Sequence, residues 1–472
     1  MATIIQQHPE FNVLPVGQDV IFAVSNTPIV ATEIGVKIRA ELHISNTFAP
    51  NLSVATNLVA TFKTTPNNAG VGMFDFRPII ESFVKADNLA RIGSSYKTVV
   101  NGADTNVPLH LIDRYSGNIN IIRFLGIQFT TEYVDNDPLS STFGNLLVDN
   151  TADNSDIYQV FNGYLNYTDE LDLVGVNFGY NISKFELSSP TDSFLTNAPV
   201  TQYANIDDYG TIAILDTENA LKFIKLIYFD SSGSQIGLEN ITKNVANGAF
   251  DQATGDNGFI GMDILYFGCF PANLQGSSTI FSGFVSAGTI EGGSIKVQAH
   301  GSASQQISKT YTINLNCPNT KGFEPIRVTW LNQWGAWDYY TFTMKSIKMI
   351  STKGSTYEQL QGSWNEATYR IDSFKGGKKA FRVNATEKIT MNTDFVNESE
   401  STWFEELINS PEVYILESFK DETATPNTAL NRYVTPVRIT TSSFTKKTIA
   451  NDRLMQYTFE VEKTKTLRTQ SI

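Results

Sequence analysis

Cysteine and histidine, the residues that build most metal and redox sites, are scarce in this sequence. Two cysteines and four histidines occur among 472 residues. Cys269 and Cys317 form no Cys-x-x-Cys pair, and no histidine lies at ligand spacing beside either one, whereas zinc sites need closely spaced thiolates and imidazoles. An acidic stretch at 251–258 departs from calcium-loop spacing and is expected to be a surface loop. We therefore expect no metal site and two buried cysteines, with a disulfide as the alternative.

Sequence motifs of catalysis are absent as well. There is no His-Glu-x-x-His run, no Gly-x-Ser-x-Gly elbow and no glycine-rich phosphate loop. The acidic pair Asp207 and Asp208 are direct neighbours, and neighbours point to opposite faces of a strand. His43 and His110 lie beside apolar residues and are expected in the core. We predict no catalytic residues, no cofactor and a protein that is not an enzyme.

Basic residues are fewer than acidic residues, and the difference is confined to the first two thirds of the sequence. The formal net charge is −13, which argues against a broad nucleic-acid surface because phosphate contacts need clustered Lys and Arg. Residues 1–320 hold 15 basic and 30 acidic residues, whereas residues 321–472 hold 20 and 18. All five tryptophans fall in the second group. One interpretation is a solvated acidic body attached to a compact Trp-rich domain, and the other is that the neutral aromatic part docks onto other subunits.

Long apolar runs are missing too. The most apolar stretch, 259–270, is interrupted by Asp263 and followed at once by Pro271, so it is too short to span a bilayer. The first ten residues have neither a basic region nor an apolar one, and we expect no secretory signal. The sequence therefore predicts no membrane segment.

What the sequence does have is the composition of a β-rich protein. Aromatic residues make up 12% of the chain, and there are 32 glycines. Branched and aromatic side chains suit pleated sheets, while Gly, Asn and Asp form turns. Short β-prone runs separated by turn signals predict tandem β-sandwich-like domains. We expect a mainly β fold with an N-terminal sandwich at 1–150, a second all-β domain at 151–320 and a Trp-rich β module at 321–472.

The C-terminal module has the clearest local patterns. Four apolar residues alternate with polar ones near the end of the chain and predict a strand with one buried face: Met455, Tyr457, Phe459 and Val461. One helix is predicted at 402–409, because Thr402 and Glu405 fit a capping box. Pro411 would end it.

An aromatic run from Trp330 to Tyr340 is the first candidate interface. Trp330 continues the alternation of the strand before it and is expected in the core. Trp334 precedes Gly335 in a turn-like stretch, where fewer neighbours should cover it, so Trp334, Trp337 and Tyr339 are interface candidates. The alternatives are an inner core layer and a carbohydrate-stacking platform.

Two basic segments are the other candidates. Lys375, Lys378 and Lys379 flank a Gly-Gly pair and predict a hairpin turn. Its lysines are expected to be solvated, and the alternatives are contact with an acidic neighbouring subunit and contact with nucleic acid.

The polar tail at 463–472 carries Lys463, Lys465 and Arg468 and has no apolar face. We expect it not to fold alone and to lie as an arm on the acidic body of a neighbouring subunit.

Three segments, in the same order, resemble virion structural proteins of tailed bacteriophages, including marine and crAss-like groups. They are residues 323–340 (FEPIRVTWLNQWGAWDYY), 403–415 (WFEELINSPEVYI) and the strand-rich stretch 436–462. The helix-then-strands ending is also similar to the tail-tube and distal-tail type of module, by analogy of fold.

The resemblance implies a structural component of the phage tail, tail hub, collar or baseplate, made in the cytoplasm of the bacterial host and carried in the virion. Its implied partners are copies of itself in a cyclic ring and other virion tail or neck proteins, and no catalytic residue is implied. The alternatives are a receptor- or glycan-binding adhesion module and, more remotely, a carbohydrate-active enzyme on a β scaffold.

Overall fold

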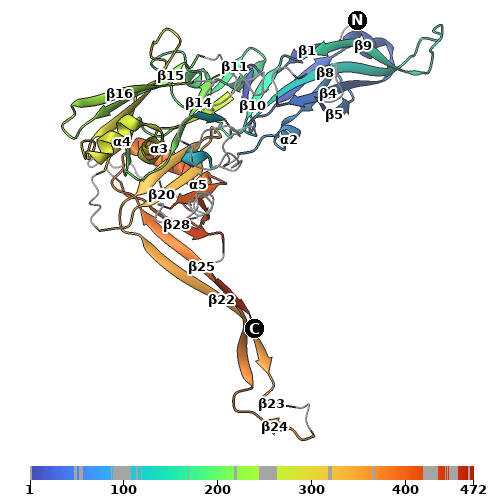
Figure 1. Cartoon of the computed structure of the whole chain (residues 1–472). Helices are drawn as coiled ribbons and strands as arrows, with labels where there is room; N and C mark the ends of the chain where they lie inside the picture. Colours follow the sequence, from blue (N-terminus) through green and yellow to red (C-terminus); the bar gives the residue numbers. More distant parts are fainter. Residues whose placement is uncertain are drawn as a thin grey trace. The chain divides into compact units, whose positions relative to one another are not determined.

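The structure is a computed structural model that describes most of residues 3–471. Outside the described residues lie 1–2, 47–49, 51, 53–56, 87, 89–107, 113–114, 118–119, 168–169, 217–219, 244–262, 317–321, 364–366, 418–433, 442, 444, 446–454, 466–467 and 472. The chain divides into two compact units. Unit 1 comprises Met1–Asn316 and Leu331–Asp338, and unit 2 comprises Cys317–Trp330 and Tyr339–Ile472. The fold is mainly β, as the composition predicts (Figure 1).

The first part of unit 1 is a sandwich of two sheets. One sheet has the order β1-β3-β6, and the other has the order β2-β10-β8-β4-β5 with β9 paired to β8. Its elements are β1 (Ile4–Gln7), β2 (Val13–Pro15), β3 (Ile21–Ser25), α1 (Thr27–Thr32), β4 (Ile34–Ser45), β5 (Leu58–Thr64), β6 (Val71–Asp75), α2 (Arg77–Ile80), β8 (Ile122–Val134), β9 (Leu146–Asn154) and β10 (Tyr158–Phe161).

Alternate side chains of the strands fill the space between these two sheets. From Val36 to Leu42, every second residue of β4 is buried, including Ile38 and Ala40, as a strand with one core face requires. Phe22 of β3 meets Phe129 of β8 with ring centroids 5.6 Å apart. Aromatic contacts across the two sheets therefore hold the sandwich together.

The rest of unit 1 contains three further sheets, ordered β13-β19-β18-β15-β16, β14-β17-β7 and β11-β12. Their strands are β7 (Tyr115–Gly117), β11 (Leu171–Val174), β12 (Asn177–Tyr180), β13 (Thr201–Ala204), β14 (Thr211–Asp216), β15 (Phe223–Phe229), β16 (Gln235–Thr242), β17 (Asp263–Gly268), β18 (Ser294–His300) and β19 (Tyr311–Leu315). The helices are η2 (Leu109–Leu111), η3 (Ser183–Phe185), α3 (Pro271–Ser277) and α4 (Thr279–Ser286).

Strand β7 joins the two parts of unit 1. Although it precedes β8 in the chain, it pairs with β17. The buried Tyr115 hydroxyl donates to the carbonyl of Ile241 at 2.7 Å and accepts from the amide of Ile224 at 2.9 Å, and burial raises the pKa of this tyrosine. Residues 1–316 form one compact unit, and the division expected at residue 150 falls inside β9.

Unit 2 is built on an eight-stranded sheet of order β21-β20-β26-β27-β28-β25-β22, with β29 paired to β25. Its elements are β20 (Ile326–Leu331), β21 (Trp337–Phe342), β22 (Ile347–Gln359), β23 (Gly362–Ser363), β24 (Arg370–Ile371), β25 (Gly377–Asn392), α5 (Glu398–Asn409), β26 (Val413–Leu416), β27 (Val434–Ile439), β28 (Thr458–Lys463) and β29 (Arg468–Ser471). Strands β23 and β24 form a separate pair.

Helix α5 covers the core of unit 2 with aromatic side chains. Trp403 lies 4.9 Å from Trp330 between ring centroids, and Phe404 lies 5.6 Å from Phe459. Met455, Tyr457, Phe459 and Val461 are all buried, which confirms the alternation predicted at the end of the chain. Trp330 is a core residue, also as predicted.

The predicted start of this helix is wrong. Helix α5 begins at Glu398, and its capping box is formed by Asn397 and Glu400, with both reciprocal hydrogen bonds present at 3.0 Å and 2.7 Å. Thr402 therefore lies inside the helix, where its amide is not an orphan. The helix ends at Asn409, two residues before Pro411, as predicted.

The polar tail is not a free arm within this chain. Arg468–Ser471 forms β29, which pairs antiparallel with Arg382–Ala385 of β25. Backbone hydrogen bonding needs no apolar face, which is why the absence of one misled the sequence interpretation.

Three of the scarce residues are buried. His43 and His110 lie in the core, as predicted, and Cys269 is buried too. Cys317 and the acidic stretch at 251–258 lie outside the described residues.

The burial of Phe459 generates a stability prediction. Phe459→Ala should lower the free energy of unfolding by about 3–5 kcal/mol, because it removes a fully buried ring and leaves a cavity. Phe395→Ala is the matched control, since the Phe395 side chain is exposed in the same unit, and it should change stability by less than about 0.5 kcal/mol. Chemical denaturation of both variants measures the difference, and equal effects would contradict the assignment of Phe459 to the core.

Candidate functional site

The aromatic loop that follows β20 lies inside unit 1. Trp334 is 1% exposed, and its ring centroid lies 4.2 Å from that of Phe185. Gly335 has a φ of +71°, and a Cβ there would lie 2.2 Å from the carbonyl oxygen of Asn162. Only glycine fits such a close approach, so the loop is seated against unit 1 by its backbone as well as by its indole ring.

Hydrogen bonds from Asn332 hold this loop in shape. Its Oδ1 accepts from the amides of Trp334 and Ala336, both at 3.0 Å, and its Nδ2 donates to the carbonyl of Leu195 at 3.0 Å. The Tyr266 hydroxyl donates to the carbonyl of Gly335 at 3.3 Å. The backbone amides of Trp334 and Ala336 and the carbonyl of Gly335 are thus paired within the unit, as buried backbone requires.

The expectation that few neighbours cover Trp334 is therefore wrong, and the other two interface candidates, Trp337 and Tyr339, are covered as well. Trp337 packs edge-on against His110 with ring centroids 5.0 Å apart, and Arg327 lies over the ring of Tyr339. All three aromatic side chains are buried within the chain, so they offer no surface to a partner. The sequence could not show this, because the residues that cover Trp334 and Trp337 are more than 100 positions away.

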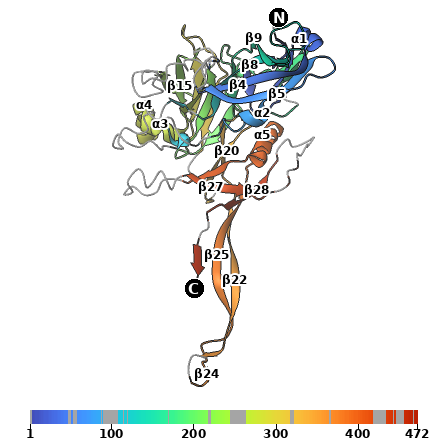
Figure 2. The same cartoon turned by 90° about the vertical axis from the view of Figure 1, so that its right-hand side faces the viewer.

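The lysines at 375–379 lie near the distal end of a long arm. The arm consists of β22, β25 and the described connecting residues 360–363 and 367–376, with β29 paired to β25 along part of its length, and it is a continuation of the unit 2 sheet (Figures 1 and 2). Lys375 forms an ion pair with Asp372 at 2.9 Å, and the Lys379 ammonium donates to the carbonyl of Phe374 at 3.0 Å. Gly376 and Gly377 both have positive φ, but the hydrogen-bonded turn is Asp372–Lys375, where the Lys375 amide donates to the Asp372 carbonyl at 3.1 Å. Gly377 already begins β25 and pairs with Gln359 of β22, so the hairpin turn predicted at the Gly-Gly pair is wrong.

The arm leaves apolar side chains in solvent. Every residue from Ile347 to Tyr357 of β22 is exposed except the half-buried Tyr357. Five apolar residues at the distal end are more than half exposed: Leu360, Tyr369, Ile371, Phe374 and Phe381. We call these five the arm tip.

Sequence reasoning missed the arm tip. The run after Gly-Gly alternates apolar and polar residues at Phe381, Val383, Ala385, Ile389 and Met391, a pattern that predicts a half-buried strand. Phe381 and Val383 are nevertheless exposed. The strand register explains why Phe381 belongs to the arm tip. A bulge between Ser355 and Thr356 leaves Phe381 without a paired residue opposite it in the β22–β25 ladder.

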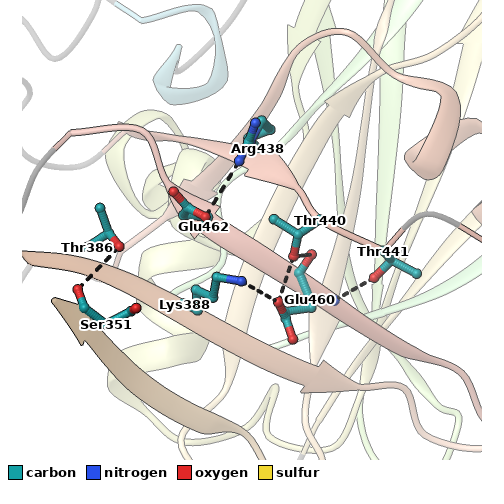
Figure 3. Close-up of polar contacts among 8 residues, drawn as sticks. All are labelled: Ser351, Thr386, Lys388, Arg438, Thr440, Thr441, Glu460 and Glu462. Atoms are coloured by element: carbon teal, nitrogen blue, oxygen red, sulfur yellow. Dashed lines mark hydrogen bonds and ion pairs between the residues drawn. The ribbon is translucent and has the colours of Figure 1, made fainter. Parts of the chain in front are cut away.

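A polar network anchors the base of the arm to the neighbouring strands (Figure 3). The Glu460 carboxylate accepts from Thr440 at 2.9 Å and from Lys388 of β25 at 3.2 Å, and its amide donates to the Thr441 hydroxyl at 2.8 Å. The hydrogen bond from Thr440 and then that from Lys388 lower the pKa of Glu460. Arg438 and Glu462 form a further ion pair at 3.6 Å.

The predicted cations of the tail contribute to the same base. Lys463 forms ion pairs with Glu387 of β25 and with Glu417, both at 3.2 Å. Partial burial acts against its charge, but these two carboxylates raise its pKa overall. Lys465 is exposed, and Arg468 belongs to β29. The contacts of Glu460 with Lys388 and of Lys463 with Glu387 hold the base of the arm in place, because each joins β25 to β28 in the body of unit 2.

In the described part of the chain, no three His, Cys, Asp or Glu side chains are grouped so that they could hold a metal ion. Among the same residues, no helix is long and apolar enough to cross a bilayer.

Comparisons with known proteins identify no family. No protein-family model and no curated protein match the chain. Among solved structures, the chain is similar to a Salmonella alpha-2-macroglobulin reacted with methylamine, with 8% identity, 90% of this chain and 22% of that chain covered, and a TM-score of 0.17. It is also similar to an E. coli alpha-2-macroglobulin in its native conformation, with 10% identity, 83% of this chain and 22% of that chain covered, and a TM-score of 0.17. The chain spans about a fifth of these proteins, and TM-scores this low carry no argument.

The buried loop generates the second prediction. Trp334→Ala should lower the free energy of unfolding by about 3–5 kcal/mol, as should Trp330→Ala, because both indoles are fully buried. Phe143→Ala serves as the control, since that ring is exposed in unit 1. Thermal unfolding followed by circular dichroism measures all three, and a Trp334→Ala variant that melts like the control would contradict the seating of the loop.

The burial of His110 generates a third prediction, which concerns how the stability of the protein depends on pH. Desolvation lowers its pKa to about 3, so the folded protein holds it neutral while the unfolded chain takes up a proton near pH 6.5. Stability should therefore fall as pH drops below 6.5, and His110 alone should account for about 2 kcal/mol between pH 7 and pH 5. Denaturation of wild type and His110→Leu at both pH values isolates this part. The same pH dependence in both proteins would exclude a neutral buried imidazole.

Proposed function

We propose that the chain is a structural subunit of a tailed-phage virion, which assembles as a ring in the tail, tail hub, collar or baseplate and has no catalytic role. In this proposal it is made in the bacterial host cytoplasm and is carried in the virion, next to copies of itself and to other tail or neck proteins. The three segments that resemble such proteins fall on β20, β21, α5, β26, β27 and β28, which form most of the core of unit 2.

The arm is the observation that carries the proposal. Its strands extend past the body of unit 2 with apolar residues on the surface. Distal to β29, the described strands of the arm are β22 and β25 paired with each other, and a two-stranded ribbon is marginally stable by itself in water. Contiguous exposed apolar surface usually marks a site of protein contact. A subunit of an assembly has a reason to keep such an arm, because a partner covers it after assembly.

The proposal predicts self-association. The purified full chain should form discrete oligomers larger than a dimer, and their share should rise with protein concentration because the contacts are intermolecular. Analytical ultracentrifugation measures the mass distribution, and negative-stain electron microscopy shows whether the particles are closed rings.

A chain that remains monomeric at every accessible concentration would overturn the ring. The virion part has its own test, which is peptide mass spectrometry of purified particles of the phage that encodes the chain. Absence of its peptides from those particles would overturn the assignment to the virion.

A further inference from the structure

We propose that the arm tip of one copy docks on the β11–β12 hairpin of unit 1 in a second copy, so that copies join head to tail. This inference rests on the self-assembly in the proposed function and names the surfaces that meet. Both surfaces belong to the described residues, and both are exposed.

The donor surface combines apolar area with positive charge. Leu360, Ile371 and Phe374 are each more than 60% exposed. Among the described residues 353–363 and 367–382, six are basic and two are acidic. Two arm tips therefore repel each other, so a partner that covers this surface must be apolar and acidic.

Unit 1 of the same chain has both properties. Residues 1–316 hold 15 basic and 30 acidic residues. The hairpin of β11 and β12 exposes Leu171, Leu173, Val174 and Val176, of which Leu173 and Val176 are more than 70% exposed. Asp172 is exposed between them. The exposed apolar residues on both surfaces can pack against each other, and the opposite charges favour this pairing over contacts between like surfaces.

The proposed contact joins the arm tip of one copy to the β11–β12 hairpin of another. Because these two surfaces differ, the same contact can add one copy after another. Each copy that receives an arm on its hairpin keeps its own arm free for the next copy. Head-to-tail contacts of this kind close into rings where the rotation between copies allows closure, and they extend into filaments where it does not. The proposed contact thus supplies the geometry that a cyclic ring needs.

Paired variants test the contact. The arm variant is Ile371→Ser with Phe374→Ser, and the hairpin variant is Leu173→Ser with Val176→Ser. Each should weaken self-association by about tenfold or more, because central apolar contacts dominate the binding energy of interfaces. The control is Leu139→Ser, which changes a side chain that is 95% exposed elsewhere in unit 1 and should assemble like wild type. Unchanged melting temperatures show that all variants fold.

Mixing the two variants gives the sharpest outcome. The arm variant keeps an intact hairpin and the hairpin variant keeps an intact arm, so an equimolar mixture can form one functional contact. We expect each variant alone to sediment as a monomer and the mixture to sediment as a dimer, with nothing larger. Larger species in the mixture, or no dimer at all, would overturn the head-to-tail contact.

Charge reversal tests the electrostatic part. Lys378→Glu and Asp172→Lys should each weaken association, and the combination of the two should recover part of the loss if the charges face each other. No recovery would overturn the assignment of Asp172 as the acidic partner.

The two proposals fail in different ways. A monomeric wild-type chain overturns self-assembly and this contact together. A wild-type chain that assembles, with arm and hairpin variants that assemble equally well, overturns only the contact.

Discussion

Two fully buried tryptophans only four positions apart belong to different compact units, and much of the structure depends on this division. Trp330 packs on Trp403 in unit 2, and Trp334 packs on Phe185 in unit 1. Directly after Trp334, the left-handed backbone of Gly335 allows the loop to approach the carbonyl oxygen of Asn162 within unit 1. One short segment therefore completes two cores, and this explains why so many aromatic residues are concentrated there.

Patterns whose cause is local were predictable from the sequence. The alternation from Met455 to Val461 reports directly which side chains face the core, and the structure confirms it. The start of helix α5 shows the limit of such patterns, because Asn397 with Glu400 and Thr402 with Glu405 both fit a capping box. The earlier box gives a longer helix that still places Trp403 and Phe404 on the core, and tertiary packing decides between the two.

Features whose cause is distant were not predictable. The residues that cover Trp334 include Phe185, which no spacing rule connects to position 334. Strand β7 pairs with β17 across well over 100 positions, so unit 1 extends past the division that composition suggests. The arm escaped notice for a different reason, because its residues are β-prone and polar enough to resemble ordinary strands. Nothing in a single sequence says that neither face of a ribbon is covered.

The distribution of charge gives the exposed apolar surface its meaning. An apolar arm with no net charge would associate with itself and with any similar patch. The basic residues around the arm tip and the acidic excess of unit 1 disfavour arm-to-arm and body-to-body contacts. The arm-to-body contact is the one pairing that both the apolar surface and the charges favour. The polar network at Glu460 then has a clear physical purpose in the proposed assembly, because an arm held at its base loses less conformational entropy on docking than a flexible one.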